Sequence, residues 1–402
     1  MASLLSLPLE IVDNIFSDFW YLDPGPYNFH PRPVEQALNT DHVDQGLAAM
    51  ARLCRTSRQL RELIEPHLYR FVCIPNATVT PLVSLLRCWD ARPHCAEYTR
   101  RLTIETKQRS KEPVPPVIRE EDVAFISGMA KRMGLQLRGD WHEFHWNSDV
   151  LVELAMFRAR YARNIEILFM ARRGIYRPPF DFILTESDSN AHIRFDNLQS
   201  LYIVQPGGLT MDELRPVMER APNLSKLHLD MCQFSNRKKA LPTGLTSLCL
   251  KTCPMPAITL ESTILNLDSL SHLEFDAACN PVEQERVLRA LSKHAQTLKS
   301  LVVSFRTRQT AHMASGGRVK TALDELSNLE SLTTDLKSFG FGVSGLVQSL
   351  PASLRELRIV SSEPATAQEL ELFAAELMAL DQEAFKDLSV HFGAQGAVFN
   401  YH

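Results

Sequence analysis

The segment 140–146 (DWHEFHW) carries the histidine spacing closest to a metal site. A zinc-binding helix uses two histidines four residues apart with a glutamate between them. Here His142 and His145 flank Glu143 but are three residues apart. The spacing therefore favours a packed loop or helix edge, and we expect no metal ion.

A run of arginines between residues 158 and 177 could hold an anionic partner or a phosphate backbone. Its members, with two interleaved tyrosines, are Arg158, Arg160, Tyr161, Arg163, Arg172, Arg173, Tyr176 and Arg177. Such a run is more often the solvated side of a helix and its following loop. The net charge of −4 adds no global basic field. We expect no nucleic-acid partner and keep nucleic-acid binding as a rival hypothesis.

Sequence motifs for covalent or phosphate chemistry are missing. No GxSxG elbow, paired-carboxylate motif or cysteine–histidine signature occurs. The glycine spacing around Gly316 does not match a phosphate-cradling loop. The eight cysteines form no CxxC pair and lie mostly among apolar neighbours, which predicts reduced core thiols. We expect a protein that is not an enzyme and needs no cofactor.

One motif, apolar-x-x-apolar-x-apolar, organises the chain from residue 198 onwards. In NLQSLYIV the apolar positions are Leu198, Leu201 and Ile203, and variants of the motif begin at Leu224, Leu245, Leu270, Leu298, Leu329 and Leu354. These leucines are 21 to 31 residues apart, a period typical of a leucine-rich-repeat solenoid. Ordinary buried strands of an α/β sheet are the alternative.

A single such repeat cannot be stable by itself. Burying three leucine-sized side chains contributes roughly 5–9 kcal/mol, while ordering some 27 residues costs at least ~1 kcal/mol each. Neighbouring repeats must therefore stack into one continuous core.

The residues between and after the strand leucines are the candidates for binding a partner. Strand alternation turns them away from the core, towards the concave side of a solenoid. They form a mixed aromatic and charged strip that suits protein recognition: Phe169, Tyr202, His228, Asp230, Lys251, Glu274, Asp276 and Arg358. A merely solvated strand face is the alternative at each position.

The N-terminal segment has a helical pattern instead. Pro8 and Glu10 suit a helix start, and apolar residues follow at helical spacing up to Phe19. Prolines between residues 24 and 33 exclude a helix there. A second helical pattern begins near Val43, restarts near Ser57, and should end before Pro66.

These N-terminal residues resemble an F-box, particularly that of fungal F-box proteins. LPLEIVDNIF matches the leucine–proline start and first helix, and LCRTSRQLRELIEPHLYRFVCIP matches the basic–serine–basic cluster and the Leu-Tyr-Arg exit. The chain between Phe16 and Leu47 is longer than in the usual F-box, which indicates an inserted loop. A loop covering the first helix would interfere with the protein contacts that an F-box makes through that helix.

The resemblance implies a surface that docks onto the Skp-type adaptor of a cullin–RING ubiquitin ligase. The residues carried over are Leu7, Pro8, Ile11, Val12, Ile15, Leu53, Cys54, Leu60 and Leu63. The alternative for each is packing within the helical unit or against the first repeat.

The expected fold is α/β: a three-helix F-box over residues 1–72, with an inserted loop at about 20–42, followed by an irregular leucine-rich-repeat solenoid over 73–402. Its parallel strands should line the concave face, with inserted loops at about 106–122 and 171–195. The expected function is substrate recognition in a Skp–cullin–F-box ubiquitin ligase, with an unknown protein as substrate. The alternative is a repeat scaffold acting outside ubiquitination.

Composition agrees with an ordinary soluble globular protein. The 402 residues are 45% hydrophobic and 22% charged. No apolar run approaches the length that spans a bilayer, and the first residues lack the positive flank of a secretory signal. The expected location is therefore the cytoplasm or nucleus, away from any membrane.

Overall fold

The computed structural model describes residues 40–75, 77–107, 118–135, 137, 141, 147–170, 193–204, 210–232, 241–253, 255–277, 281–305, 323–335, 346–361, 367–378, 388–394 and 397–401. Within them the strands form one sheet of twelve, ordered β1 to β12 as in the sequence. Each neighbouring pair up to β10–β11 is parallel, and β12 closes the sheet antiparallel to β11.

The strands recur once per repeat. Their bounds are β1 Phe71–Ile74, β2 Arg101–Lys107, β3 Asn164–Met170, β4 Ser200–Val204, β5 Lys226–Asp230, β6 Ser247–Lys251, β7 His272–Ala277, β8 Ser300–Phe305, β9 Ser331–Thr334, β10 Glu356–Ser361, β11 Ser389–Ala394 and β12 Ala397–Tyr401.

Helices precede the sheet and fill many of the connections between its strands. Their bounds are α2 Thr40–Thr56, α3 Arg58–Leu68, α4 Val79–Ala91, α5 Pro93–Tyr98, α6 Glu120–Arg132, α7 Asn147–Arg158, α8 Met211–Glu219, α9 Ala257–Asn266, α10 Pro281–Leu291, the 3₁₀ turn η3 Ser292–His294, and α12 Ala367–Met378.

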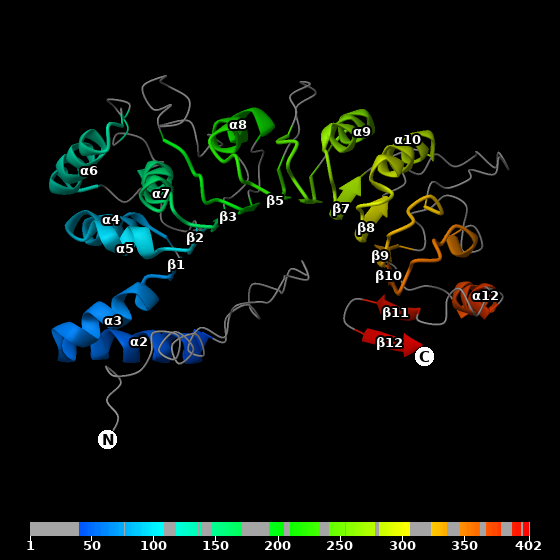
Figure 1. Cartoon of the computed structure of the whole chain (residues 1–402), viewed down its shortest axis with the longest axis horizontal. Helices are drawn as coiled ribbons and strands as arrows, with labels where there is room; N and C mark the ends of the chain where they lie inside the picture. The colour runs from blue at the N-terminus through cyan, green and yellow to red at the C-terminus, as the bar shows by residue number, and fades with distance from the viewer. Residues whose placement is uncertain are drawn as a thin grey trace.

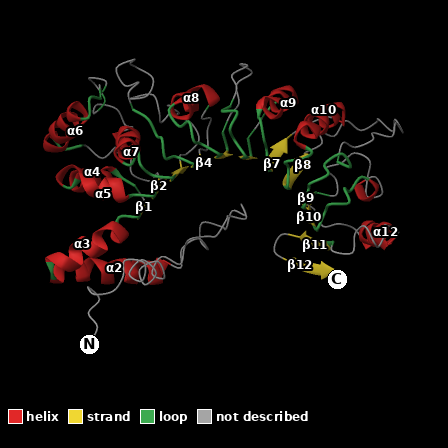
Figure 2. Ribbon diagram, viewed as in Figure 1, coloured by secondary structure: helices red, strands yellow, loops and turns green. Residues whose placement is uncertain are grey.

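The sheet curves into an open arch. Figure 1 shows the strands succeeding one another along the inside of the arch, with the connecting helices outside. The same separation of strands from helices is visible in Figure 2. This mixed α/β arrangement, a parallel sheet not closed into a barrel, fits a leucine-rich-repeat solenoid.

Stacked apolar side chains hold the arch together. The middle leucine of each predicted repeat is fully buried and lies in register with the next: Leu201, Leu227, Leu248, Leu273, Leu301, Leu332 and Leu357. They belong to one hydrophobic cluster that runs from β1 to β11. Each repeat therefore covers the core of its neighbour.

Helices α2 and α3 form a separate unit at the N-terminal end of the arch (Figure 1). Their small core holds Met50, Cys54 and Ile64, and is distinct from the solenoid core. Ser57 caps α3, because its hydroxyl accepts a hydrogen bond from the Leu60 amide at 3.1 Å.

One local expectation at this end was wrong: helix α3 does not end before Pro66 but continues to Leu68. Strand β1 then begins at Phe71 and pairs directly with β2 of the solenoid. Sheet pairing thus begins at once after the helical unit. The predicted first helix, most of the predicted loop at 20–42 and the central parts of the other two loops lie outside the described residues.

The part of the chain that the structure describes contains no helix that is both long and apolar enough to cross a membrane.

Candidate functional site

The inner face of the sheet is built from rows of side chains set by strand register. One row runs across the strands through Thr103, Glu166, Tyr202, His228, Cys249, Glu274, Val302, Thr333 and Arg358. A second row, two residues further along each strand, contains Glu105, Leu168, Val204, Asp230 and Lys251. Alternation along a strand places both rows on one face, opposite the leucine ladder.

The centre of this face, on β4 to β7, is a continuous chain of contacts. The rings of Tyr202 and His228 meet edge to face, with centroids 4.2 Å apart. The Cys249 sulfur lies 3.7 Å from Nε2 of His228, and its thiol donates to Oε2 of Glu274 at 3.1 Å. Four neighbouring repeats therefore each contribute one side chain to a single row.

Burial suppresses positive charge at this row. His228 is only 4% exposed, although it lies on the inner face. Burial, followed by the charges of Lys251 and His272, lowers the pKa of His228 to about 3. The imidazole is therefore neutral at physiological pH.

Burial also acts on the carboxylates. It raises the pKa of Asp230 and of Glu274, and in both cases Lys251 opposes the shift. Burial raises the pKa of Tyr202 as well, with a further contribution from Asp230. At the centre of the face, partial burial therefore disfavours the ionised form of these acidic groups.

The backbone after β5 and β6 adopts the same unusual conformation. Met231 and Thr252 both have positive φ, at 59° and 51°. The Met231 amide donates to the Lys251 carbonyl at 3.0 Å, which joins the two turns. Asp230 is the last residue of β5 and directly precedes the first of these two strained turns.

Acidic groups towards the two ends of the face are paired instead. Glu166 accepts from Arg101 at 2.7 Å and from Thr103 at 3.0 Å. Near the other end, Glu356 pairs with Arg358 at 2.6 Å, and the hydrogen bond from Arg358 helps to lower the pKa of Glu356 although burial opposes it.

Register corrects one predicted site residue. Phe169 is 4% exposed and follows Ile165 and Ile167 on the core side of β3, so it does not lie on the inner face. Glu166 takes the position level with Tyr202. The fully buried positions of β3 before Phe169 are the isoleucines Ile165 and Ile167. The other predicted residues of the face, from Tyr202 to Arg358, lie on the strands as expected.

The predicted adaptor surface is described only in part. Leu7, Pro8, Ile11, Val12 and Ile15 lie outside the described residues. On α2, Leu53 is 36% exposed, whereas Cys54 is buried in the small core. On α3, Leu60 and Leu63 are partly buried against that core. Cys54 thus packs inside the unit, and the three leucines remain candidates for a contact surface.

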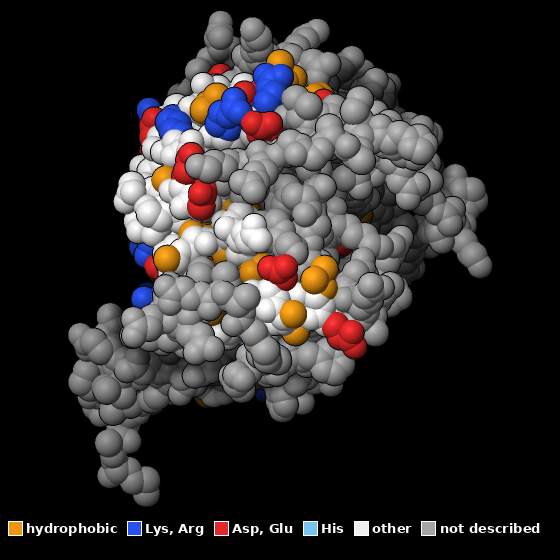
Figure 3. Space-filling model, turned by 90° about the vertical axis from the view of Figure 1, so that its right-hand side faces the viewer, with side chains coloured by type: hydrophobic (Ala, Val, Ile, Leu, Met, Phe, Trp, Pro, Cys, Tyr) orange, Lys and Arg blue, Asp and Glu red, His pale blue; other side chains and the backbone are white. Residues whose placement is uncertain are grey.

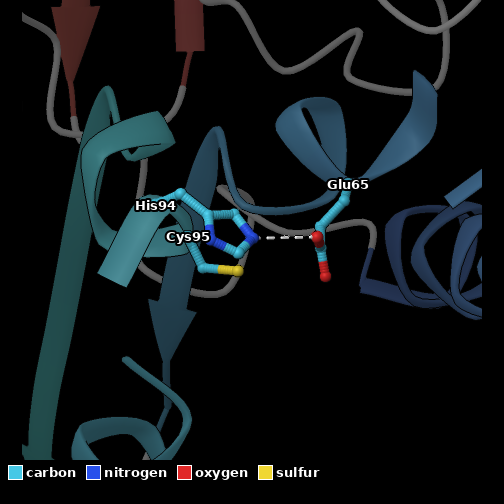
Figure 4. Close-up of side chains that lie close together, drawn as sticks. All are labelled: Glu65, His94 and Cys95. Carbon is cyan, nitrogen blue, oxygen red and sulfur yellow. Dashed lines mark hydrogen bonds and ion pairs between the residues drawn. The ribbon is translucent and has the colours of Figure 1, made fainter. Parts of the chain in front are cut away.

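Glu65 connects the helical unit to the first repeat (Figure 4). Its carboxylate accepts from Arg92 at 2.6 Å and contacts Nε2 of His94 at 3.1 Å. Neighbouring Cys95 is fully buried. Sequence reasoning missed this group, because its members are 27 or more residues from Glu65 and belong to no motif.

Glu65, His94 and Cys95 could also be considered as metal ligands, since their ligand atoms lie within 4.8 Å of one another. Two observations disfavour this. The Arg92 guanidinium already neutralises the carboxylate, and burial, followed by the charge of Glu65, raises the pKa of Cys95 to about 12. A protonated thiol beside a paired carboxylate fits an interhelix connection better than a cation site.

The arginines of the run that the structure describes make separate contacts. Arg158 is partly buried and donates to the Trp89 carbonyl, while Arg160 lies against Tyr161. Arg172, Arg173 and Arg177 lie outside the described residues, as do His142, Glu143 and His145.

At the C-terminal flank of the solenoid, Figure 3 shows a group of Lys and Arg side chains with acidic side chains close by.

The cysteines agree with reduced core thiols. The seven within the described residues are free, and five of them are buried: Cys54, Cys95, Cys232, Cys249 and Cys253.

No model of a known protein family matches the sequence, and no curated protein matches it. One solved structure with a local likeness is the leucine-rich repeat-containing protein LegL7 from Legionella pneumophila. The likeness has 13% sequence identity and a TM-score of 0.22, and covers 47% of this chain and 93% of that one. The assignment to the solenoid class accordingly depends on the sheet and its repeats.

Proposed function

We propose that the protein is the substrate-recognition subunit of a Skp–cullin–F-box ubiquitin ligase. The N-terminal helical unit would bind the Skp-type adaptor, and the inner face of the solenoid would bind the target protein. Catalysis would then consist of proximity, since holding a target beside a ubiquitin-charged enzyme raises its effective concentration. The chain itself would supply no reacting group.

One observation carries the proposal: the F-box-like helices are joined to the solenoid without a linker. Helix α3 ends at Leu68 and β1 begins at Phe71. The Arg100 amide donates to the Arg70 carbonyl at 2.8 Å, and Glu65 pairs with Arg92. A fixed distance between an adaptor site and a target site is what a proximity mechanism needs.

Exposed apolar surface on the helical unit adds support. Leu53 is 36% exposed, and Leu60 and Leu63 are only partly covered. All three lie in LCRTSRQLRELIEPHLYRFVCIP, the second part of the F-box resemblance. Covering these leucines with an adaptor would complete the small core of the unit.

Co-purification with a Skp-type adaptor tests the proposal. We expect wild type to capture the adaptor, and Leu53→Asp and the double variant Leu7→Asp/Pro8→Ala to lose it. Leu265→Asp is the matched control, because Leu265 is a similarly exposed leucine (45%) on the solenoid helix α9. Circular dichroism should show that all variants fold. Failure of folded wild type to bind the adaptor would remove the ligase proposal.

A repeat scaffold outside ubiquitination remains the second candidate. The solenoid architecture supports it equally, since such a sheet presents a binding face whether or not an adaptor is attached. It predicts partner binding through the inner face with no adaptor in the complex.

A further inference from the structure

We propose that the inner face between β4 and β7 binds one lysine or arginine side chain from an extended segment of the partner protein. This inference rests on the proposed function only in taking the inner face as the partner-binding surface. The positions that define the site, called the acidic centre below, are Tyr202, Asp230, Lys251 and Glu274.

The charges of the acidic centre, counted without the neighbouring carboxylate Asp276 of β7, leave room for one cation. Asp230 and Glu274 make no ion pair with any residue that the structure describes, although the ion pairs of Glu166 and Glu356 lie on the same face. Lys251 is on the strand between them, and its charge opposes the raised pKa of both carboxylates. Two carboxylates and one ammonium leave a single negative charge for a guest to neutralise.

The carboxylates are also incompletely satisfied. Oδ1 of Asp230 is buried and accepts no hydrogen bond within the described part of the chain. Glu274 accepts from the Cys249 thiol, a weak donor. Desolvated carboxylates with few donors destabilise the free protein, and a guest ammonium or guanidinium would offset that cost through charge-assisted hydrogen bonds.

An aromatic ring lies on the strand next to Asp230, at Tyr202 of β4. Tyr202 is half-buried, and its ring is fixed edge to face against His228. A cation over the face of a tyrosine ring is attracted by the ring's electrons, and more strongly when it is desolvated. Because His228 is neutral, it does not repel such a guest.

Other guests fit this chemistry less well. Phosphate groups would be repelled by the net negative charge. Among the described residues, the one group with ligand atoms close enough for a metal ion is Glu65, His94 and Cys95, at the N-terminal end of the solenoid. A basic side chain is therefore the guest that the geometry and charge favour.

Selection from a random peptide library displayed on phage tests the inference without knowledge of the natural partner. The full chain serves as bait. An enriched peptide is then synthesised with its lysine replaced by acetyl-lysine or its arginine by citrulline, and binding is measured by fluorescence polarisation. We expect enriched peptides to share a basic residue, and its neutralisation to weaken binding at least about tenfold.

Two double variants separate the acidic centre from the general charge of the face. Asp230→Asn/Glu274→Gln should weaken binding by a similar factor. The matched control Glu166→Gln/Glu356→Gln removes the same number of carboxylates from the same face, but from paired positions, and should bind within about twofold of wild type. Circular dichroism confirms that each variant folds.

Three results would overturn the inference: enriched peptides without a basic residue, equal weakening by both double variants, or no enrichment on folded bait. Adaptor co-purification remains a separate readout. If the adaptor does not bind but peptide binding still depends on Asp230 and Glu274, the ligase proposal is removed and the inference stands.

Discussion

The two cores of the described chain differ in how they are completed. In the solenoid, every ladder leucine is covered by the repeats on either side, and β12 pairs with β11 at the C-terminal end. In the α2–α3 unit, three buried residues are surrounded by leucines that are only partly covered. Within the described residues, the solenoid core is therefore more completely covered than the core of the α2–α3 unit.

The largest expected effect comes from interrupting the ladder. Leu227→Ala removes a fully buried side chain between Leu201 and Leu248, and should lower the free energy of unfolding by about 2–5 kcal/mol. Chemical denaturation measures the loss, and hydrogen exchange should show faster exchange on both neighbouring strands. Loss of protection on β5 alone would contradict a continuous core.

The same type of change in the helical unit should have a more local effect. Ile64 is also fully buried, so Ile64→Ala should cost a similar 2–4 kcal/mol, as a rough estimate. Because its core is separate, faster hydrogen exchange should be confined to α2 and α3. Spread of the effect to β4–β8 would mean that the two cores unfold together.

The connection between the two regions should contribute less than either core. Glu65→Ala leaves Arg92 and His94 without their shared acceptor and should cost about 1–3 kcal/mol. The rate of amide hydrogen exchange should rise in α5. Glu65→Gln keeps the side-chain volume and one acceptor, so it should lower the free energy of unfolding less than Glu65→Ala. Equal losses in the two variants would assign the effect to packing.

Lowering the pH should reduce the stability of the protein through His228, at the centre of the inner face. The pKa of His228 falls from its usual 6.5 to about 3 on folding, mainly through burial. The unfolded chain therefore binds more protons between these values, and stability falls as the pH drops from about 6.5 towards 3. His228→Gln should flatten this part of the stability profile in urea denaturation. An unchanged slope would show that His228 is not the responsible group.

The smallest expected effect is a gain in stability. Burial raises the pKa of Asp230 and Glu274 above that of the unfolded chain, so their contribution is favourable at low pH and is lost as the pH rises through the folded value. Asp230→Asn/Glu274→Gln should therefore raise the melting temperature slightly at neutral pH. A lower melting temperature would mean that the carboxylates stabilise the free protein.

The sequence could predict much of the solenoid and less of the site. Spacing alone located β4 to β10, because a strand with one buried face must alternate over a few consecutive residues. It failed at β3, where isoleucines replace the leucines of the motif: Phe169 was assigned to the inner face but lies on the core side with Ile165 and Ile167. It also missed α5, a short helix whose six residues carry no periodic signal.

What the sequence determined by itself was the repeat: its period, its buried leucines and the row from Tyr202 to Arg358. These depend on local patterns within single segments. Tertiary structure decided which of those residues are charged and accessible. His228 and Cys249 are buried by adjacent strands, and Glu65 reaches Arg92 across two helices. Asp230 and Glu274 have no ion pair with any described residue. Burial and pairing are properties of neighbours brought together by folding, so no spacing along the chain could have specified them.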